Sequence, residues 1–153
     1  MVWRPKFVHR PRDEQEIANI LARVAEDGGR LKPVGSGLSW SDINEVEGEH
    51  LLRLDQMTSI DVQPDMKRVT VQGGAVMSDI QNALGEQNLT LENIGSIVTQ
   101  TAAGYTGTGT HGSGTPLLST FIEEMQLVDG RGQVRTLSPS NEPELFSAAR
   151  VHL

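Results

Sequence analysis

Residues 95–114 have the composition of a ligand-binding loop. They include six of the chain's sixteen glycines and seven serine or threonine hydroxyls, and they contain no Asp, Glu, Lys or Arg. Glycines let backbone N–H groups approach a ligand closely, and such a surface suits an anion that is bound by neutral dipoles. The alternative is a flexible linker. Because a linker would not usually carry Ile97, Tyr105 and the single histidine His111, we interpret the segment as a ligand loop.

A second glycine-containing loop, GSGLSWS at residues 35–41, follows the apolar run 31–34. A loop that follows a strand in this way is a candidate phosphate-binding loop. The alternative is the dinucleotide fingerprint GxGxxG, in which the third glycine allows tight packing of strand and helix. Gly35 and Gly37 would supply the first two glycines, but Trp40 and Ser41 occupy the region of the third. The GxxxxGK[ST] motif is absent from the sequence, so neither nucleotide fingerprint is complete.

Charge and composition limit the ligands and partners. The 153 residues include 13 Lys and Arg against 20 Asp and Glu, which gives a net charge of −7. This balance argues against non-specific binding to nucleic acid or to anionic membranes. Without cysteine the chain has no disulfides and no thiolate metal site, and we expect no metal. With no apolar run of signal-peptide or membrane-spanning length, we expect a cytoplasmic protein that contacts no membrane.

The first 57 residues alternate between strand and helix patterns. Short apolar runs at residues 7–8, 31–34 and 51–54 predict three strands. Asp13 followed by Glu16 resembles a capping box, and the helical spacing that begins at Ile17 runs up to a pair of glycines. Strands that alternate with helices indicate a small parallel sheet, which we assign to a first lobe, residues 1–57.

From residue 58 the pattern favours antiparallel pairing. Two alternating segments around residues 64–65 predict a hairpin, and a helix carrying Ile80 and Leu84 follows. Apolar segments at 121–128 and 134–137 flank a second turn, and Ser140-Asn141 is expected to cap a last helix. Residues 58–153 therefore form a second lobe with a mixed or antiparallel sheet, and the fold class is α+β.

Three segments, VGSGLSWS at 34–41, NIGSI at 93–97 and THG at 110–112, occur in the order and spacing of a known family. On these motifs the chain resembles the FAD-binding domain of the vanillyl-alcohol oxidase/p-cresol methylhydroxylase (PCMH) superfamily, and most closely the aldonolactone and alditol oxidases. The resemblance extends over essentially all 153 residues. It implies a two-lobed PCMH-type fold that clasps FAD, with a second lobe truncated at its C-terminus and no substrate domain.

The resemblance also implies which residues lie beside FAD: Gly35, Ser36, Gly37, Leu38, Ser39, Gly95, Ser96, Gly104, Thr110, His111 and Gly112. The physical interpretation agrees, because two neutral, amide-rich loops suit a pyrophosphate. His111 has three open roles: a general base, a donor to the cofactor, or a packed residue that holds the loop. Many relatives carry a histidine bonded to the flavin where this chain has Leu38, so FAD is expected to bind non-covalently.

The implied function is that of the FAD-binding portion of a flavin-dependent oxidoreductase, which oxidises a CH–OH group of a sugar lactone or polyol by hydride transfer to flavin. No catalytic residue is identified from the sequence. The alternative is a non-catalytic flavin- or nucleotide-binding module that serves a partner chain. The resemblance also implies that Gly95 lies near flavin C4a, where glycine would leave a path for oxygen. Alone, the 153 residues are expected to bind FAD weakly or not at all, to be inactive, and to self-associate through an exposed sheet edge.

Overall fold

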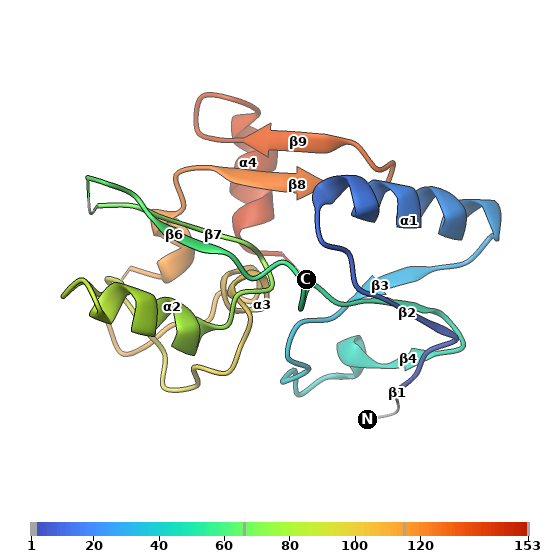
Figure 1. Ribbon diagram of the computed structural model, residues 1–153, viewed down its shortest axis with the longest axis horizontal. Coiled ribbons are helices and arrows are strands. Elements are labelled where there is room, and N and C mark those ends of the chain that lie inside the picture. Colours follow the sequence, from blue (N-terminus) through green and yellow to red (C-terminus); the bar gives the residue numbers. More distant parts are fainter. Residues whose placement is uncertain (1–2, 66, 115, 153) are drawn as a thin grey trace.

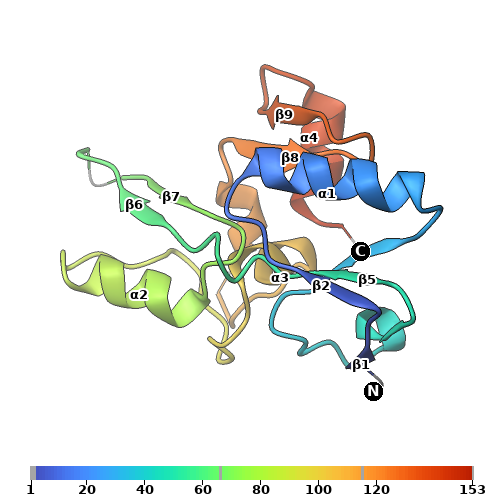
Figure 2. The same ribbon diagram turned by 45° about the vertical axis from the view of Figure 1, so that its right-hand side comes forward.

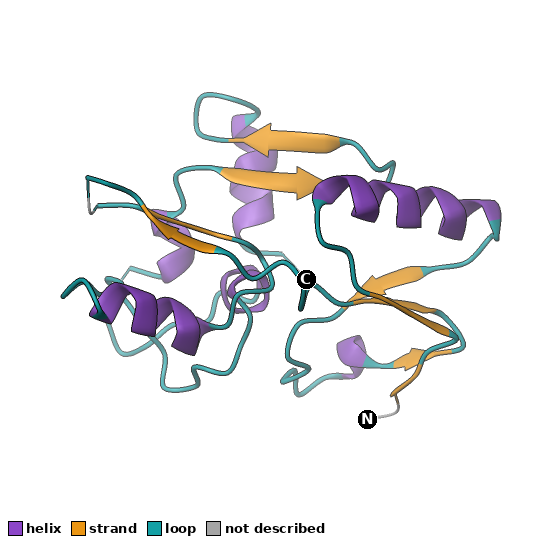
Figure 3. Ribbon diagram, in the orientation of Figure 1, coloured by secondary structure: helices purple, strands orange, loops and turns teal. Residues whose placement is uncertain are grey.

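The computed structural model describes residues 3–65, 67–114 and 116–152 as a mixed α/β structure with separate parallel and antiparallel sheets (Figures 1 and 3). The first half contains the predicted parallel sheet, in the order β2-β5-β3. Its strands are β2 (Phe7–His9), β3 (Leu31–Pro33) and β5 (His50–Leu52). Two further short strands, β1 (Trp3–Arg4) and β4 (Val46–Glu47), form a separate parallel pair. A 3-10 turn, η1 (Asp42–Asn44), follows the loop that leaves β3.

Helix α1 (Glu14–Glu26) covers one face of this sheet and begins where the sequence predicts. The Asp13 carboxylate accepts a hydrogen bond from the Glu16 backbone N–H at 2.7 Å, which satisfies one of the helix's unpaired amides. The buried side chains of α1 pack with those of the sheet and its following turn: Ile17, Ile20, Val24, Leu52 and Met57. This packing fixes the end of β3, from which the loop 35–41 emerges.

The second half is built around a buried tyrosine. The predicted hairpin is β6 (Ile60–Val62) with β7 (Val69–Val71), and helix α2 (Met77–Gly85) packs beside it. A short helix, α3 (Ala102–Gly107), carries Tyr105, which is fully buried in the core that these elements share. The remaining elements are η2 (Leu118–Phe121), β8 (Met125–Val128), β9 (Val134–Leu137) and α4 (Pro143–Arg150).

The hairpin of β8 and β9 lies against α1 of the first half (Figure 2). Val128 packs on the α1 core, and Gly132 lies beside Ala18. Arg135 of β9 pairs with Glu142, immediately before α4. Segments that are more than 100 residues apart in the sequence therefore contact each other, and the division into lobes at residue 57 stays a prediction.

Three local predictions are wrong. Residues 102–107 of the glycine stretch form α3 because the Thr101 hydroxyl accepts from the Gly104 N–H and caps the turn, which offsets the low helix propensity of glycine. The strand expected at 121–128 begins only at Met125, after the 3-10 turn. The last helix begins at Pro143, whose ring is preorganised for the first helical position. Ser140-Asn141 is therefore not its cap.

Candidate cofactor-binding site

The loop at 35–41 and the glycine stretch contact each other, although some sixty residues separate them. The Ser36 hydroxyl donates to the carbonyl of Thr99 at 2.5 Å. Gly35 lies directly against Thr101, and a Cβ on Gly35 would overlap the threonine hydroxyl. Glycine is therefore required at position 35 for the two loops to approach.

The first backbone N–H groups of α3 donate to acceptors within the protein. The N–H groups of Ala102 and Ala103 donate to the carbonyls of Ala75 and Gly73, at 2.7 and 3.1 Å. The next amide, that of Gly104, donates to the Thr101 hydroxyl. These contacts orient the glycine stretch, and they use the first amides of α3 within the fold.

Asn93 holds the two ends of the glycine stretch together. Its side chain is 4% exposed, and its amide donates to the carbonyls of Gly114 and Pro116, the latter at 2.8 Å. Its side-chain oxygen accepts from the Gly112 N–H at 2.8 Å. Gly112 also lies so close to the carbonyl of Ile94 that a Cβ would overlap it. One buried amide thus determines where the segment 110–114 passes the segment 93–97.

Tyr105 also holds the segment 93–97 in place, through Gly95. Its buried hydroxyl accepts from the Gly95 N–H at 2.6 Å. A Cβ on Gly95 would lie 3.1 Å from that hydroxyl and 3.2 Å from the His111 carbonyl oxygen. Of the predicted residues, Gly95, Gly104, Thr110 and Gly112 therefore donate their backbone N–H groups within the protein, that of Thr110 to the Tyr105 carbonyl at 3.0 Å.

The remaining predicted amides have no protein acceptor. Among the described residues, the N–H groups of 35–39, Ser96 and His111 donate to no protein atom. Gly37 adopts φ +72°, the left-handed conformation that alternates with right-handed residues in backbone anion nests. Free amides in a neutral, glycine-rich environment are the donor set that a pyrophosphate requires, so these residues fit the group.

The predicted side chains differ in how they are held. Leu38 is 47% exposed, and Trp40 beside it is fully exposed. The Thr110 hydroxyl accepts from the Gln100 amide at 3.2 Å and lies 2.9 Å from that of Thr108. The exposed His111 ring has Nδ1 2.7 Å from the carbonyl of Gly112. No carboxylate in the described ranges contacts this ring, so His111 lacks the acidic partner of a typical general base.

Sequence analysis missed the residues that shape this site from behind. Asn93, Thr101 and Tyr105 accept from loop backbone N–H groups, and the Thr99 carbonyl accepts from the Ser36 hydroxyl, yet none was predicted as a site residue. Asn93 did stand within the NIGSI motif, which was a usable signal. The contacts of Thr99, Thr101 and Tyr105 depend on the tertiary packing of the chain, which no local sequence pattern predicts.

In the parts of the chain that the structure describes, no three His, Asp or Glu side chains gather as metal ligands. No helix within the same ranges is long and apolar enough to cross a membrane.

Comparison with known proteins supports the chemistry of the two loops. The family model described as FAD binding domain matches residues 5–138. The chain belongs to this family. The matched range contains both glycine-bearing loops, and the residues behind them, Asn93 and Tyr105, lie within the FAD-binding domain as well.

Relatives of this FAD-binding domain act on sugar lactones. L-gulonolactone oxidase of Bos taurus is 33% identical over 153 residues, which cover 97% of this chain and 34% of that protein. L-gulono-1,4-lactone dehydrogenase of Mycobacterium tuberculosis is 36% identical over 154 residues, covering 99% and 35%. D-arabinono-1,4-lactone oxidase of Eremothecium gossypii is 34% identical over 157 residues, covering 98% and 29%. The chain spans about a third of the length of these curated relatives.

Solved structures show the same fold. 6-Hydroxy-D-nicotine oxidase from Arthrobacter nicotinovorans superimposes with a TM-score of 0.91 at 24% identity, over 98% of this chain and 34% of that one. Glucooligosaccharide oxidase from Acremonium strictum gives 0.85 at 22% identity, over 97% and 32%. The FAD-binding domain described here thus has the PCMH-type architecture that the motifs predict.

Proposed function

We propose that this protein is the FAD-binding portion of a flavin-dependent oxidoreductase that oxidises a CH–OH group of a sugar lactone or polyol by hydride transfer to flavin. The observation that supports it best is the set of unpaired amides at residues 35–39, beside a glycine stretch without charged side chains. The lactone substrates of the three relatives support the substrate class. Cytoplasmic location and self-association through a sheet edge stay predictions.

Each loop has a distinct task in this proposal. The amides of residues 35–39 bind the pyrophosphate, and the hydroxyl of Ser36 ties that loop to the glycine stretch. Thr110 and His111 present their exposed atoms along the same stretch. When bound, FAD supplies the hydride acceptor, while the protein orients it. No residue of the described chain is assigned as catalytic.

A titration with FAD tests the proposal, with a glycine variant in the pyrophosphate loop. We expect weak but saturable quenching of flavin fluorescence, competition by ADP, and little competition by riboflavin, which has no pyrophosphate. Gly37→Ala strains a left-handed residue within the loop by about 1–2 kcal/mol and should weaken FAD binding at least tenfold.

Gly48→Ala is the matched control. Gly48 has nearly the same backbone conformation, φ +68°, with open space around it and no contact with either loop. It should cost similar stability but leave FAD affinity unchanged. If both variants weaken FAD binding equally, or if ADP does not compete with FAD, the assignment of the pyrophosphate loop is wrong.

The rival function is a non-catalytic flavin- or nucleotide-binding module that acts with a partner chain. The two proposals share the FAD site and differ in what the bound flavin does. Anaerobic mixing of the FAD-loaded full-length protein with an aldonolactone distinguishes them, because the proposed oxidoreductase bleaches the flavin absorbance without a partner chain. Bleaching that requires a second purified chain would favour the rival.

We expect FAD to be bound without a covalent bond. Leu38 occupies the position of the flavin-linked histidine in many relatives, and an alkyl side chain has no nucleophilic nitrogen. The chain also lacks cysteine, whereas glucooligosaccharide oxidase carries a 6-S-cysteinyl, 8α-N1-histidyl FAD. Acid precipitation should leave the flavin in the supernatant. A yellow pellet would contradict the expectation, and Leu38→His tests whether the exposed position can form the bond.

The glycine at position 95 is expected to let oxygen reach the flavin. Photoreduced protein should reoxidise quickly in air, and Gly95→Ala should slow the reaction several-fold. Because the added methyl would also press on the Tyr105 hydroxyl at 3.1 Å, the double variant Gly95→Ala/Tyr105→Phe is compared with Tyr105→Phe alone. Equal reoxidation rates within that pair would reject the oxygen-gate assignment.

A further inference from the structure

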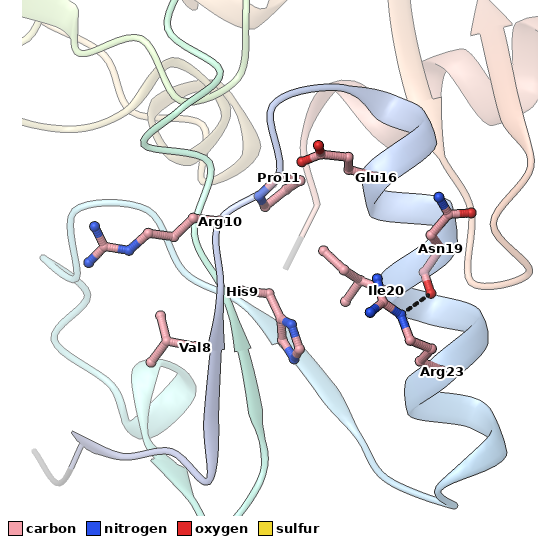
Figure 4. Close-up of a pocket in the computed structure, with 8 residues that line it drawn as sticks. All are labelled: Val8, His9, Arg10, Pro11, Glu16, Asn19, Ile20 and Arg23. Carbon is pink, nitrogen blue, oxygen red and sulfur yellow. Dashed lines mark hydrogen bonds between the residues drawn. The ribbon is translucent and has the colours of Figure 1, made fainter.

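A hollow of about 520 Å³ lies between β2 and α1 (Figure 4). It contains no residue of the two glycine-bearing loops, and the cofactor proposal does not use it. Its lining comes from the strand, the turn after it and one side of the helix: Val8, His9, Arg10, Pro11, Glu16, Asn19, Ile20 and Arg23.

His9 is held rigidly at one side of this hollow. Its Nε2 lies 2.9 Å from Nδ1 of His50, and the two rings are parallel within 4°, so the hydrogen bond lies in the plane of both. His50 is 7% exposed and packs against the Phe7 ring, with centroids 4.9 Å apart. The pair therefore fixes the orientation of the His9 ring and leaves its Nδ1 available to a ligand.

Arg23 faces His9 from the helix. Figure 4 shows the His9 ring directed from β2 toward α1, and the Arg23 side chain turned back toward the strand. Arg23 Nε donates to the carbonyl of Asn19 at 3.3 Å, and within the described residues no carboxylate pairs with its guanidinium. Arg10 points to the opposite side of the strand, where it lies 3.6 Å from Asp55.

The charges around His9 leave a place for a counter-ion. Burial lowers the pKa of His9, and the nearby His50 and Arg23 lower it further. Glu16 is the acidic side chain among the lining residues, but its carboxylate is engaged at one end of the hollow by the Arg12 backbone N–H at 2.9 Å. An anion between His9 and Arg23 would accept hydrogen bonds from both side chains. Its negative charge would raise the pKa of His9.

We propose that this hollow binds a small oxyanion, a phosphate or a carboxylate, between His9 Nδ1 and the guanidinium of Arg23. The site is separate from the FAD site, so neither proposal depends on the other. Binding strengthens as the pH falls from 8 to 6, because protonation of His9 adds a second positive charge and a donor.

Histidine proton NMR tests the site on the intact chain. Inorganic phosphate and acetate are titrated separately at constant ionic strength, with chloride as the balancing anion. His9→Gln identifies the His9 resonance by its absence. We expect a saturable shift of that resonance and a higher His9 pKa when the site is occupied. Acetate keeps one charge between pH 6 and 8, so its pH dependence reports on the protein.

Two arginine variants decide whether the site is specific. Arg23→Gln should weaken anion binding about tenfold, as expected for loss of a charged hydrogen bond. Arg68→Gln removes a cation that pairs with Asp65 at the β6–β7 turn, far from the hollow, and should change nothing. Tighter binding of phosphate or of acetate identifies the ligand class. Absence of a saturable shift with both anions, or equal effects of the two variants, would overturn the proposal.

Discussion

Replacement of Asn93 with alanine is expected to lower the free energy of unfolding by about 3 kcal/mol and to abolish measurable FAD binding. The change removes three hydrogen bonds at once, to Gly112, Gly114 and Pro116. The penalty is large because Asn93 is buried, so the partners it leaves unpaired are shielded from water. Urea unfolding followed by circular dichroism measures the first effect, and flavin fluorescence measures the second.

Asn82→Ala is the control for this experiment. Asn82 lies on the exposed side of α2, where alanine is the better helix former, so the same chemical change should leave stability unchanged or slightly raised. Asn93→Asp keeps the acceptor for the Gly112 N–H but puts a buried carboxylate oxygen against the Gly114 and Pro116 carbonyls, so it should destabilise the fold at least as much as Asn93→Ala. Wild-type FAD affinity in Asn93→Ala would show that the ends of the glycine stretch need no such anchor.

Gly112→Ala should lower stability and FAD affinity about as much as Asn93→Ala, by a different mechanism. Its Cβ would overlap the Ile94 carbonyl oxygen, a backbone atom that cannot move without displacing the NIGSI segment. Forcing extra volume into such a contact costs about 1–3 kcal/mol, and here it also separates the Asn93 amide from its partner. We expect a lower midpoint of thermal unfolding and at least a tenfold loss of FAD affinity.

Gly114→Ala is the matched comparison within the same segment. A Cβ at that position would lie 3.5 Å from the Asn93 side-chain nitrogen, an ordinary contact distance. We therefore expect near-wild-type stability and FAD binding. The opposite ranking of the two alanine variants would mean that the path of residues 110–114 differs from the one described.

The amino-acid sequence alone determined the local elements with strong signals. Asp13 and Glu16 predicted the start of α1, and alternating apolar residues predicted the β6–β7 hairpin, because caps and short-range periodicity act within a few residues. The two glycine-bearing loops were found in the same way, from composition. Their motifs also predicted an FAD-binding domain, and the family match over residues 5–138 confirms it.

Tertiary structure decided which atoms of those loops remain free. Helix α3 forms in a glycine-rich segment because the amides of Ala102 and Ala103 bond to the carbonyls of Ala75 and Gly73, which are 27 and 30 residues earlier, and such contacts override propensity. The same long-range contacts pair Gly95 with Tyr105, and they set the bond between Asn93 and Gly112. His9 and Arg23 face each other only because α1 packs across the parallel sheet. The spacing of residues along the chain does not predict these tertiary contacts, because they depend on how whole helices and strands pack.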